Sequence, residues 1–318
     1  MAISPEVKQE KLNIESVAWG DLTWIDIEPP TPREMAYLAK NYPFHPYDLD
    51  DCLSRKQRPK LDEYEDYLFF IFHFTIYNKE TRVSTHDQVS VFLGEKYLIT
   101  MHSGRLKPLV KLFHDCQVNE EARQDNLSHG SGFVLYRIID RAVDAYFPIL
   151  DKIIDLMEDV EEVVFDENVE AALEVASLRR NIITQRRIMF PVRTAVAELE
   201  SKLKRFSKID MSVYLGDLMD HMNKICETLD ECKETIEVFK DADYVLGADR
   251  LNRIMRVLTI ISTIMLPLIV ISGLWSMNIP LPFGANPGGS PYFFGVMVVT
   301  LLSVVVAMLY FFHRKRWI

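Results

Sequence analysis

Apolar residues collect in two long runs at the C-terminal end of the chain, within 57 residues (257–313) that contain no Asp, Glu, Lys or Arg. The first run, 257–275, has 19 residues and the second, 292–312, has 21. An α-helix rises about 1.5 Å per residue, so each run would span roughly 30 Å, the thickness of the hydrocarbon core of a bilayer. The pattern predicts two membrane-spanning helices joined by a loop, 276–291, rather than two buried helices of a soluble protein.

The first 130 residues instead show short alternating runs separated by turn residues, a pattern typical of strands. A run that begins at Thr23 ends at a pair of prolines, and Pro32 then opens a helical pattern. Three segments rich in aromatic and β-branched residues follow at 60–77, 83–94 and 96–102. The last two meet at Glu95-Lys96, which predicts a tight hairpin. We therefore expect residues 1–130 to form an α+β domain with helices and a mostly antiparallel sheet.

From residue 131 onward the apolar positions repeat with the period of a helix. Segments 132–165 and 168 to about 204 predict an antiparallel helix pair within the region 131–210, and Pro191 should kink or interrupt the second helix. A third helix, 211–277, includes the first span and would be roughly 100 Å long, so it needs partners along its length. Because two spans in one protomer cannot enclose an aqueous path, we expect an oligomer with this helix at its axis.

The charges lie almost entirely outside the two apolar runs. Residues 1–256 hold all 46 acidic residues and 33 of the 36 basic ones, a net charge of −13 that disfavours a nucleic-acid partner and is compatible with cations. Arg250, Arg253 and Arg256 precede the first span, and the basic tail 313–318 follows the second. The positive-inside rule therefore predicts a multi-pass protein of the cell (inner) membrane, in contact with lipid. Both termini would be cytoplasmic and 276–291 would be an external loop.

Signatures of catalysis are missing from the sequence. It contains no nucleophile elbow, P-loop or dinucleotide fingerprint, so we predict neither an enzyme nor an organic cofactor. The four cysteines, Cys52, Cys116, Cys226 and Cys232, have no metal-binding spacing, and in the cytoplasm we expect them to be reduced and inert.

The first apolar run ends in Ser276-Met277-Asn278. An Asn just beyond a membrane helix offers a carbonyl oxygen, and a symmetric ring of such oxygens suits a hydrated Mg²⁺, which sheds its waters reluctantly. An Asn at a helix end is also a common cap, so these residues alone leave both interpretations open.

The chain resembles the CorA family of divalent-cation channels, whose hallmark is a Gly-Met-Asn motif after the first of two C-terminal spans. Further segments that match this family, in chain order, are 51–53, 57–60, 64–68, 88–90 with 93–94, 214–221, 252–259 with Pro267, and 314–317. The resemblance implies a homopentamer shaped as a cytoplasmic funnel. The long helix would line the pore and the second span would form an outer ring that faces lipid.

The resemblance also implies which residues line the pore. Asp241 and Asn252 would form polar rings toward the cytoplasm, and Met255, Leu258 and Leu266 would gate the pore by excluding water. The full candidate stripe on the first span is Asn252, Met255, Leu258, Ser262, Leu266, Ile269, Gly273 and Ser276. Simple helix packing is the alternative explanation for each Leu and Met.

Asp217, with Asp220 nearby, lies in the segment that resembles the family's regulatory site between subunits. There, cytoplasmic Mg²⁺ bridges carboxylates of neighbouring protomers and holds the pore closed, which implies that Mg²⁺ is a regulatory ligand as well as a substrate. The sequence does not identify the partner carboxylate, and a solvated acidic helix face is the alternative.

Three features depart from the family pattern. Ser276 stands where the family has Gly, the segment after Asn278 has no acidic residue, and Ile269 stands where relatives often place a hydroxyl. The expected function is uptake of Mg²⁺, with Co²⁺ and Ni²⁺ as further substrates. The departures keep two alternatives open: a zinc transporter of the same superfamily, driven by a proton gradient, and a non-conducting membrane protein that senses ions or acts as a scaffold.

Overall fold

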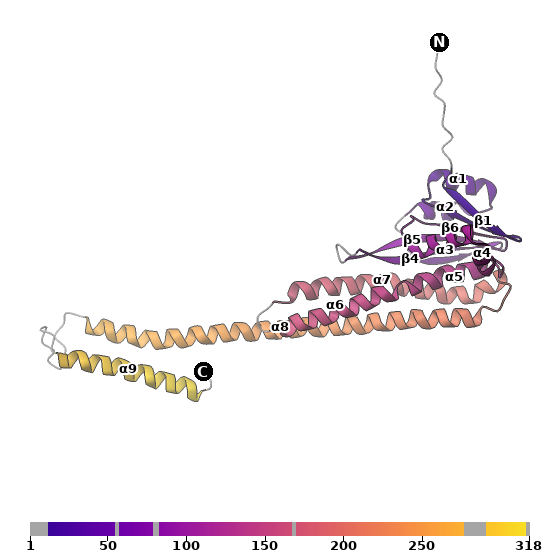
Figure 1. The fold of residues 1–318 in the computed structure, drawn as a ribbon. Coiled ribbons are helices and arrows are strands. Elements are labelled where there is room, and N and C mark those ends of the chain that lie inside the picture. Colours follow the sequence, from indigo (N-terminus) through magenta and orange to yellow (C-terminus); the bar gives the residue numbers. More distant parts are fainter. Residues whose placement is uncertain (1–11, 55–56, 79–82, 167–169, 277–290, 316–318) are drawn as a thin grey trace, which may run out of the picture. The chain divides into compact units, whose positions relative to one another are not determined.

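The computed structural model describes residues 12–54, 57–78, 83–166, 170–276 and 291–315 (Figure 1). These residues fall into two compact units, which we describe separately. The first unit is drawn from 1–164 and 171–240, and the second from 165–170 and 241–318.

The first unit is built on a six-stranded sheet with the order β1-β2-β6-β5-β4-β3. The strands are β1 (Ile14–Trp19), β2 (Leu22–Ile27), β3 (Lys60–Glu63), β4 (Tyr67–Asn78), β5 (Val83–Gly94) and β6 (Tyr97–Met101). The pair β2·β6 is parallel, and the other neighbouring pairs are antiparallel, as predicted. Leu93 lies opposite Leu98 across the hairpin predicted at Glu95-Lys96.

One face of the sheet is covered by α1 (Pro32–Asn41) and α2 (Pro46–Leu53) (Figure 1). Helix α1 begins where predicted, because Pro32 occupies its first turn and Thr31 and Glu34 form a capping box around it. The side chains buried between this face and the two helices are Ile25, Ile27, Met35, Leu38, Phe44, Leu49, Cys52, Tyr67, Phe69, Ile71, Phe92, Ile99 and Met101. Alternate residues of each strand point to this face, as the period of a strand requires.

The other face packs against helices that include two not predicted from the sequence, α3 (Lys107–Val118) and α4 (Glu120–Leu127). Trp24 of β2 is fully buried here, with its ring centroid 5.0 Å from that of Phe113 of α3. Helices α5 (Ser131–Asp144) and α7 (Ala172–Leu203) complete the cover of this face (Figure 1).

The segment 132–165, predicted as one helix, is divided into α5 and α6 (Phe147–Phe165), so the predicted helix pair is wrong in its number of helices. Pro148 accounts for the break, because proline lacks the N–H that a continuing helix needs and is tolerated only in the first turn of a new one. Pro191 behaves in the opposite way. Helix α7 continues through it, with Met189 and Val192 buried on either side. Of the two predicted outcomes, a kink or an interruption, the interruption is therefore wrong.

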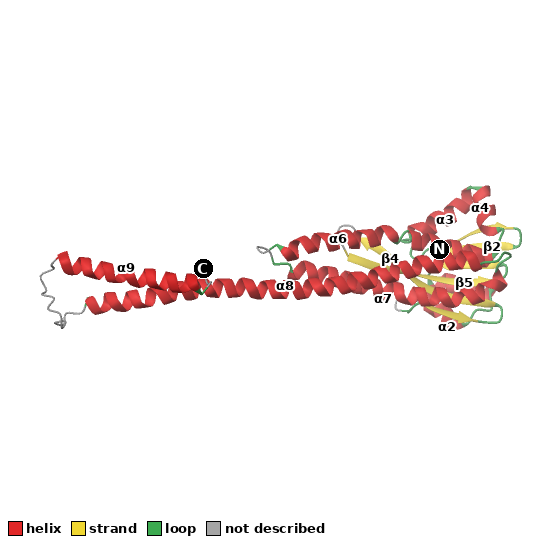
Figure 2. Cartoon of the chain, turned by 90° about the horizontal axis from the view of Figure 1, so that it is seen from below, coloured by secondary structure: helices red, strands yellow, loops and turns green. Residues whose placement is uncertain are grey.

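Within the first unit, α6 and α7 lie beside the first part of α8 (Ser212–Trp275), as Figures 1 and 2 both show. A 3₁₀ turn, Lys204–Phe206, ends α7 before α8 begins. Arg179 of α7 and Glu237 of α8 form an ion pair 2.6 Å long. The buried apolar residues of α8 in this unit follow the repeat of a helix, three or four positions apart except where Cys226 follows Ile225 directly: Leu215, Leu218, Met222, Ile225, Cys226, Leu229, Cys232, Ile236 and Phe239.

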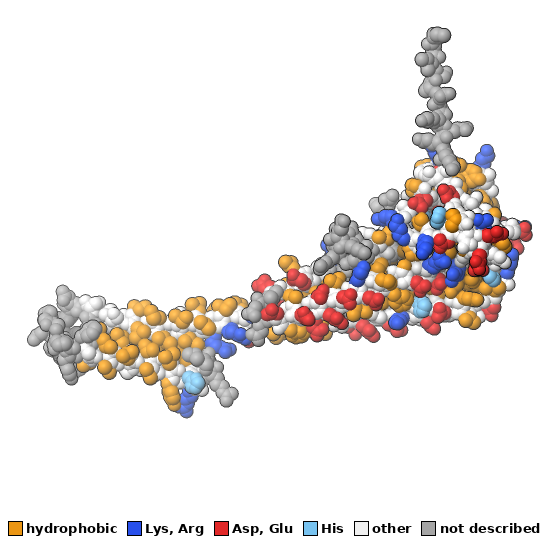
Figure 3. All heavy atoms as spheres, in the orientation of Figure 1, with side chains coloured by type: hydrophobic (Ala, Val, Ile, Leu, Met, Phe, Trp, Pro, Cys, Tyr) orange, Lys and Arg blue, Asp and Glu red, His pale blue; other side chains and the backbone are white. Residues whose placement is uncertain are grey.

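The second unit contains the rest of α8, from Asp241, and α9 (Pro291–Arg314). Both helices are long and apolar enough to cross a membrane, in agreement with the two predicted spans. Figure 3 shows hydrophobic side chains over most of their visible surface, with basic side chains where the apolar part of α8 begins and where α9 ends. The predicted external loop, 276–291, lies outside the described residues except for its first and last positions.

Candidate functional site

The predicted filter begins at Ser276, which closes the last turn of α8. Its backbone N–H donates to the carbonyl oxygens of Ser272 (3.1 Å) and Gly273 (3.2 Å), and its Oγ donates to Gly273 at 2.9 Å. The serine hydroxyl is therefore committed to the helix end. Met277 and Asn278, the other two residues of the predicted filter, lie outside the described residues.

The predicted pore stripe on α8 is exposed in the single chain. Met255, Leu258, Leu266 and Ile269 are exposed by 54, 55, 66 and 65 %, and Asp241, Asn252, Ser262 and Gly273 are exposed too. Other apolar residues around the same helix, Val257, Ile261 and Val270, are exposed by 53, 55 and 51 %. Exposure therefore does not separate the predicted stripe from the rest of the helix. Apolar surface on this scale requires lipid or further protein around it.

Two threonine hydroxyl groups within the first span are satisfied inside the helix. Thr259 Oγ1 donates to the carbonyl of Met255 at 2.7 Å, and Thr263 Oγ1 donates to that of Thr259 at 2.6 Å. Polar groups in a bilayer need internal partners of this kind. Just before the span, Arg250 donates to the carbonyl of Asp166 at 2.8 Å, within the same unit.

The predicted regulatory residue Asp217 lies in a group of carboxylates on α5 and α8. Burial raises the pKa of Asp140 above its usual range, the charges of Asp144 and Asp217 add to this effect, and Arg137 and His221 oppose it. Asp144 Oδ1 lies 4.0 Å from His221 Nδ1, and Arg137 Nη1 lies 3.7 Å from Asp140 Oδ2. The carboxylates of Asp140, Asp144 and Asp217 therefore influence one another, and Arg137 and His221 offset only part of their negative charge.

Asp140 and Asp144 were missed in the sequence. Their four-residue spacing on a helix, which puts both carboxylates on one face, was the available signal. Their proximity to Asp217, more than seventy positions later in the chain, could not be predicted from a single sequence. Asp220, the second predicted residue, is exposed, and it is not among the described charges that shift the pKa of Asp140.

A second cluster, Asp26, Glu28 and His102, has ligand atoms within 4.8 Å of one another at the ends of β2 and β6. His102 Nε2 lies 3.0 and 3.1 Å from the two carboxylate oxygens of Asp26, and His102 Nδ1 accepts a hydrogen bond from the N–H of Gly104 at 3.0 Å. A neutral imidazole that accepts at Nδ1 carries its proton on Nε2 and donates it to Asp26. A metal bound at Nε2 would need the opposite tautomer, with Nδ1 as a donor. Asp26 and His102 therefore form a buried hydrogen-bonded pair, and in this tautomer Nε2 is not available to a metal.

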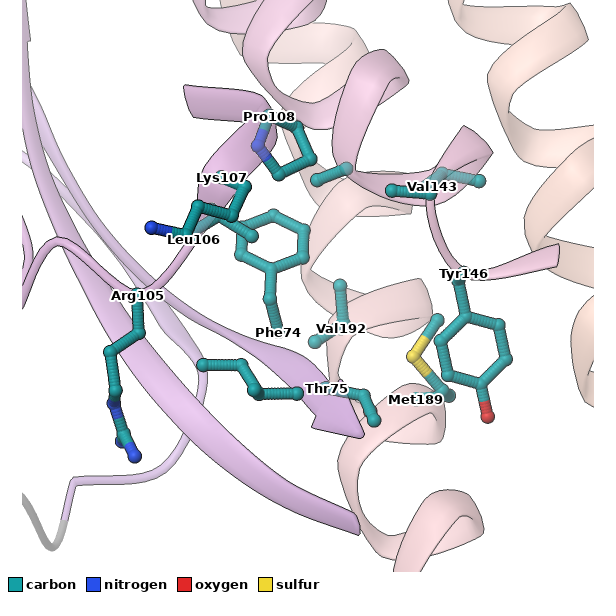
Figure 4. Close-up of a pocket in the computed structure, with 13 residues that line it drawn as sticks. Phe74, Thr75, Arg105, Leu106, Lys107, Pro108, Val143, Tyr146, Met189 and Val192 are labelled. Carbon is teal, nitrogen blue, oxygen red and sulfur yellow. The ribbon is translucent and has the colours of Figure 1, made fainter. Parts of the chain in front are cut away.

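A cavity of about 150 Å³ lies between β4, the loop before α3, the junction of α5 and α6, and α7 (Figure 4). Figure 4 shows the charged ends of Arg105 and Lys107 directed away from Tyr146. The Tyr146 hydroxyl itself donates to Gln185 Oε1 at 3.0 Å. The walls are mainly apolar: Phe74, Leu106, Val143, Met189 and Val192. Among the residues described there, the cavity offers no set of oxygen ligands for a cation.

Comparison with known proteins accounts for nearly the whole chain. A family model described as CorA-like Mg2+ transporter protein matches residues 19–316. The protein YfjQ of Bacillus subtilis is 31% identical to this chain over 309 residues. The alignment covers 97% of this chain and 92% of YfjQ, whose name gives metal ion transport as a provisional activity. The zinc transport protein ZntB of Yersinia pseudotuberculosis is 22% identical and covers 93% of this chain and 88% of its own length.

The fold is similar to that of a solved structure, the complete structure of CorA magnesium transporter from Methanocaldococcus jannaschii. The two agree with a TM-score of 0.78 over 95% of this chain and 94% of the other, at 23% sequence identity. At this level of identity the likeness concerns the fold: an α+β domain, a long helix and two apolar C-terminal helices.

Proposed function

This chain belongs to the family of CorA-like Mg²⁺ transporters, and we propose that it is a membrane channel that admits Mg²⁺ to the cytoplasm, with Co²⁺ and Ni²⁺ as further substrates. The observation that carries the proposal is the agreement of residues 19–316 with a family of transporters for divalent metal cations. The two apolar helices, exposed in the single chain, supply the membrane-spanning part.

The channel would be a homopentamer in which each α8 contributes one copy of the stripe from Asn252 to Ser276. The exposure of apolar side chains all around α8 supports this arrangement, because one side can face a pore and its neighbours while the other contacts α9 and lipid. Arg250, Arg253 and Arg256 on one side of the first span favour cytoplasmic termini in the inner membrane.

The membrane potential suffices to drive uptake. A divalent cation that crosses an inside-negative membrane gains about 4.6 kcal/mol per 100 mV, so the proposed channel needs neither ATP nor a catalytic site. The segment after Asn278 has no acidic residue to attract cations. Capture would therefore depend on the carbonyl oxygens of the filter, with Asn278 as the first ligand to the hydrated ion.

Liposome flux tests this function. Purified full-length protein is reconstituted under an inside-negative potential, and Mg²⁺ and Zn²⁺ entry are followed with and without a pH gradient. We expect Mg²⁺ entry without a pH gradient and its loss in Asn278→Ala. Absence of flux for both ions would exclude transport, whereas Mg²⁺ flux that survives Asn278→Ala unchanged would exclude the proposed filter and leave transport standing.

Zinc transport is the second candidate function. The similarity to ZntB favours it, as does Ser276 in place of the glycine of the Gly-Met-Asn motif. In the same liposomes, Zn²⁺ entry that requires a pH gradient, without Mg²⁺ entry, would assign the chain to this activity.

We further propose that Asp217 takes part in regulation by cytoplasmic Mg²⁺, together with Asp140 and Asp144. Their mutual repulsion is relieved when a divalent ion binds between them, and loss of the ion would loosen the contact between α5 and α8. A carboxylate of a neighbouring protomer can complete the same site, because Asp144 and Asp217 are exposed.

A further inference from the structure

The cavity of about 150 Å³ in the first unit is enclosed by apolar side chains from β4, α5 and α7 (Figure 4). Phe74, Val143, Met189 and Val192 of its wall are each exposed by 5 % or less, so the wall is formed by the folded chain itself. An apolar cavity of this volume stays dry and can hold a molecule of the size of benzene. The cavity therefore has room for one small ring.

The hydroxyl groups that border the cavity are already bonded within the protein. Thr75 Oγ1 donates to Gln185 Oε1 at 2.9 Å, and the Tyr146 hydroxyl donates to the same oxygen at 3.0 Å. The interior therefore offers a ligand mainly carbon and sulfur. The rings of Phe74 and Tyr146 and the thioether of Met189 favour an aromatic ligand, because rings and sulfur pack well against another ring.

The rim of the cavity carries positive charge. Among the residues that the structure describes there, Arg105 and Lys107 are the charged ones; both are exposed, and Figure 4 shows their charged ends directed away from Tyr146. Asp87 pairs with Arg105 at 3.3 Å, whereas Lys107 forms no ion pair with the described part of the chain. Two cations against one carboxylate leave an excess of positive charge. The N-terminus of α3, which begins at Lys107 without an acidic residue in its first turn, adds to it.

The surface next to the rim does not extend this charge. A depression shares Lys107 and Pro108 with the cavity and is lined further by two basic and two acidic residues, Lys111, Arg141, Asp115 and Asp144. Because these four charges cancel, the excess is confined to the rim. This distribution favours a ligand with a single negative charge over a polyphosphate.

We propose that the cavity binds a small aromatic carboxylate, with its ring inside the cavity and its carboxylate at the rim beside Lys107. Burial of the ring removes apolar surface from water. The ammonium group of Lys107 and the N-terminus of α3 attract the carboxylate, so the charge selects which ring-bearing molecule enters. The site uses no residue of the transport path and stands whether or not the channel conducts.

Binding of para-fluorobenzoate, followed by fluorine NMR, tests the site. Full-length protein in detergent should broaden the resonance of this probe, with protein-free micelles as the blank. Unlabelled benzoate should restore the narrow line, and inorganic phosphate at the same concentration should not, because it has no ring to bury. We expect para-fluorobenzyl alcohol, which has the ring without the charge, to bind at least about tenfold more weakly, the factor that follows loss of one hydrogen bond to a charged group.

Two variants locate the bound probe. Lys107→Gln should weaken the binding of fluorobenzoate at least about tenfold and leave that of the neutral alcohol unchanged. Val192→Phe, which fills the cavity with a larger side chain, should abolish the binding of both. If Val192→Phe does not fold, Ala145→Leu, at an exposed position of the lining, replaces it. Lys111→Gln, one turn later on α3 and outside the lining of the cavity, is the matched control and should bind as the unaltered protein does.

Four results would overturn the proposal. The first is absence of broadening, and the second is broadening that survives both Lys107→Gln and the cavity-filling variant. Displacement by phosphate as effective as that by benzoate would reduce the site to an anion contact at the rim. Equal affinity for the acid and the alcohol would leave an apolar cavity that does not select for charge.

Discussion

His102 Nε2 lies 3.0 Å from Oδ1 and 3.1 Å from Oδ2 of Asp26, and both side chains are almost fully buried where the parallel strands β2 and β6 end. Thr100 Oγ1 donates to the same carboxylate. Asp26→Asn would replace an acceptor of these bonds with an amide that has donors of its own. We expect this to lower the free energy of unfolding by about 2 kcal/mol, the cost of leaving buried polar groups unmatched.

Calorimetric titration of the same variant with Co²⁺ tests the conclusion that His102 Nε2 is not available to a metal. The number of bound ions should not change from that of the unaltered protein. Loss of one Co²⁺ in Asp26→Asn, in protein that keeps its circular dichroism spectrum, would contradict the tautomer assigned to His102.

The stability of the first unit should depend on the ionisation of Asp48, a buried residue of α2 whose Oδ2 accepts from the Tyr67 hydroxyl at 3.1 Å. Burial raises the pKa of Asp48 above its usual range, although hydrogen bonds from Tyr64 and Tyr67 oppose the shift. The folded state then holds the proton more firmly than the unfolded state. Stability is greatest below the unfolded pKa and falls as pH rises through the folded pKa.

Asp48→Asn removes this loss, so it should raise the free energy of unfolding at neutral pH by on the order of 1 kcal/mol and have little effect in acid. Thermal unfolding between acid and neutral pH measures the difference. Asp210→Asn is a control of opposite sign, because Ser212 lowers the pKa of Asp210. That variant should be less stable than the unaltered protein at neutral pH and equal to it in acid. Equal Tm shifts of Asp48→Asn at all pH values would argue against the raised pKa.

The four cysteines should resist modification in the folded protein. All four are buried, and burial raises the pKa of Cys116 and of Cys226 to about 11 and raises that of Cys52 and Cys232 as well. The thiolate is the reactive form, so alkylation at neutral pH should be at least roughly a hundredfold slower in the native protein than in denaturant. Mass spectrometry after timed exposure to N-ethylmaleimide measures this ratio for each cysteine. Rapid native labelling of any one of them would place it at the surface.

Cytoplasmic Mg²⁺ should protect the full-length protein from limited proteolysis if it binds at Asp217. We expect protection at about 20 mM Mg²⁺, a concentration within an order of magnitude of the dissociation constants of weak carboxylate sites. Protection should be lost in both Asp217→Asn and Asp140→Asn. Glu227→Gln, an exposed change on the same helix, is the matched control and should retain protection. Protection that persists in Asp217→Asn would leave this residue as part of a solvated helix face.

Ser276→Gly should increase Mg²⁺ flux several-fold. The serine hydroxyl bonds back to Gly273 and holds the end of α8 closed, whereas glycine at this position frees the backbone that follows. Liposome flux relative to the unaltered protein measures the effect, and Ser272→Gly, one turn earlier on the same helix, controls for a general weakening of its end. Unchanged flux in Ser276→Gly would mean that this residue does not limit the filter.

The membrane spans and the sheet were predictable from the sequence, because the surrounding solvent and the local residue pattern determine them. Lipid requires long uncharged runs, so both spans were found, and alternation revealed the sheet and its hairpin at Glu95-Lys96. Helix α4 was missed because its residues, EEARQDNL, are mainly polar, and only contacts with α3, α5 and β1 place it.

The prolines illustrate where local rules end. Pro148 marks the start of α6 and Pro191 lies within α7, although proline opposes helix continuation equally in both. Helix α7 continues through Pro191 because the residues around it are buried, and burial depends on the whole fold. Contacts between residues that are far apart in the chain also depend on the whole fold. Neither the carboxylates near Asp217 nor the cavity beside Tyr146 could therefore be predicted from one sequence.

Helix α8 runs without interruption from Asp241 through Pro267 to Trp275. Each residue of an α-helix turns its successor by about 100°. A single deletion between Asn252 and Leu258 would therefore rotate every later side chain away from its present direction, even though no side chain had changed its chemistry. The count of residues in this segment should consequently be under stricter selection than their identities: Leu exchanged for Ile or Met would be tolerated where the loss of one residue would not.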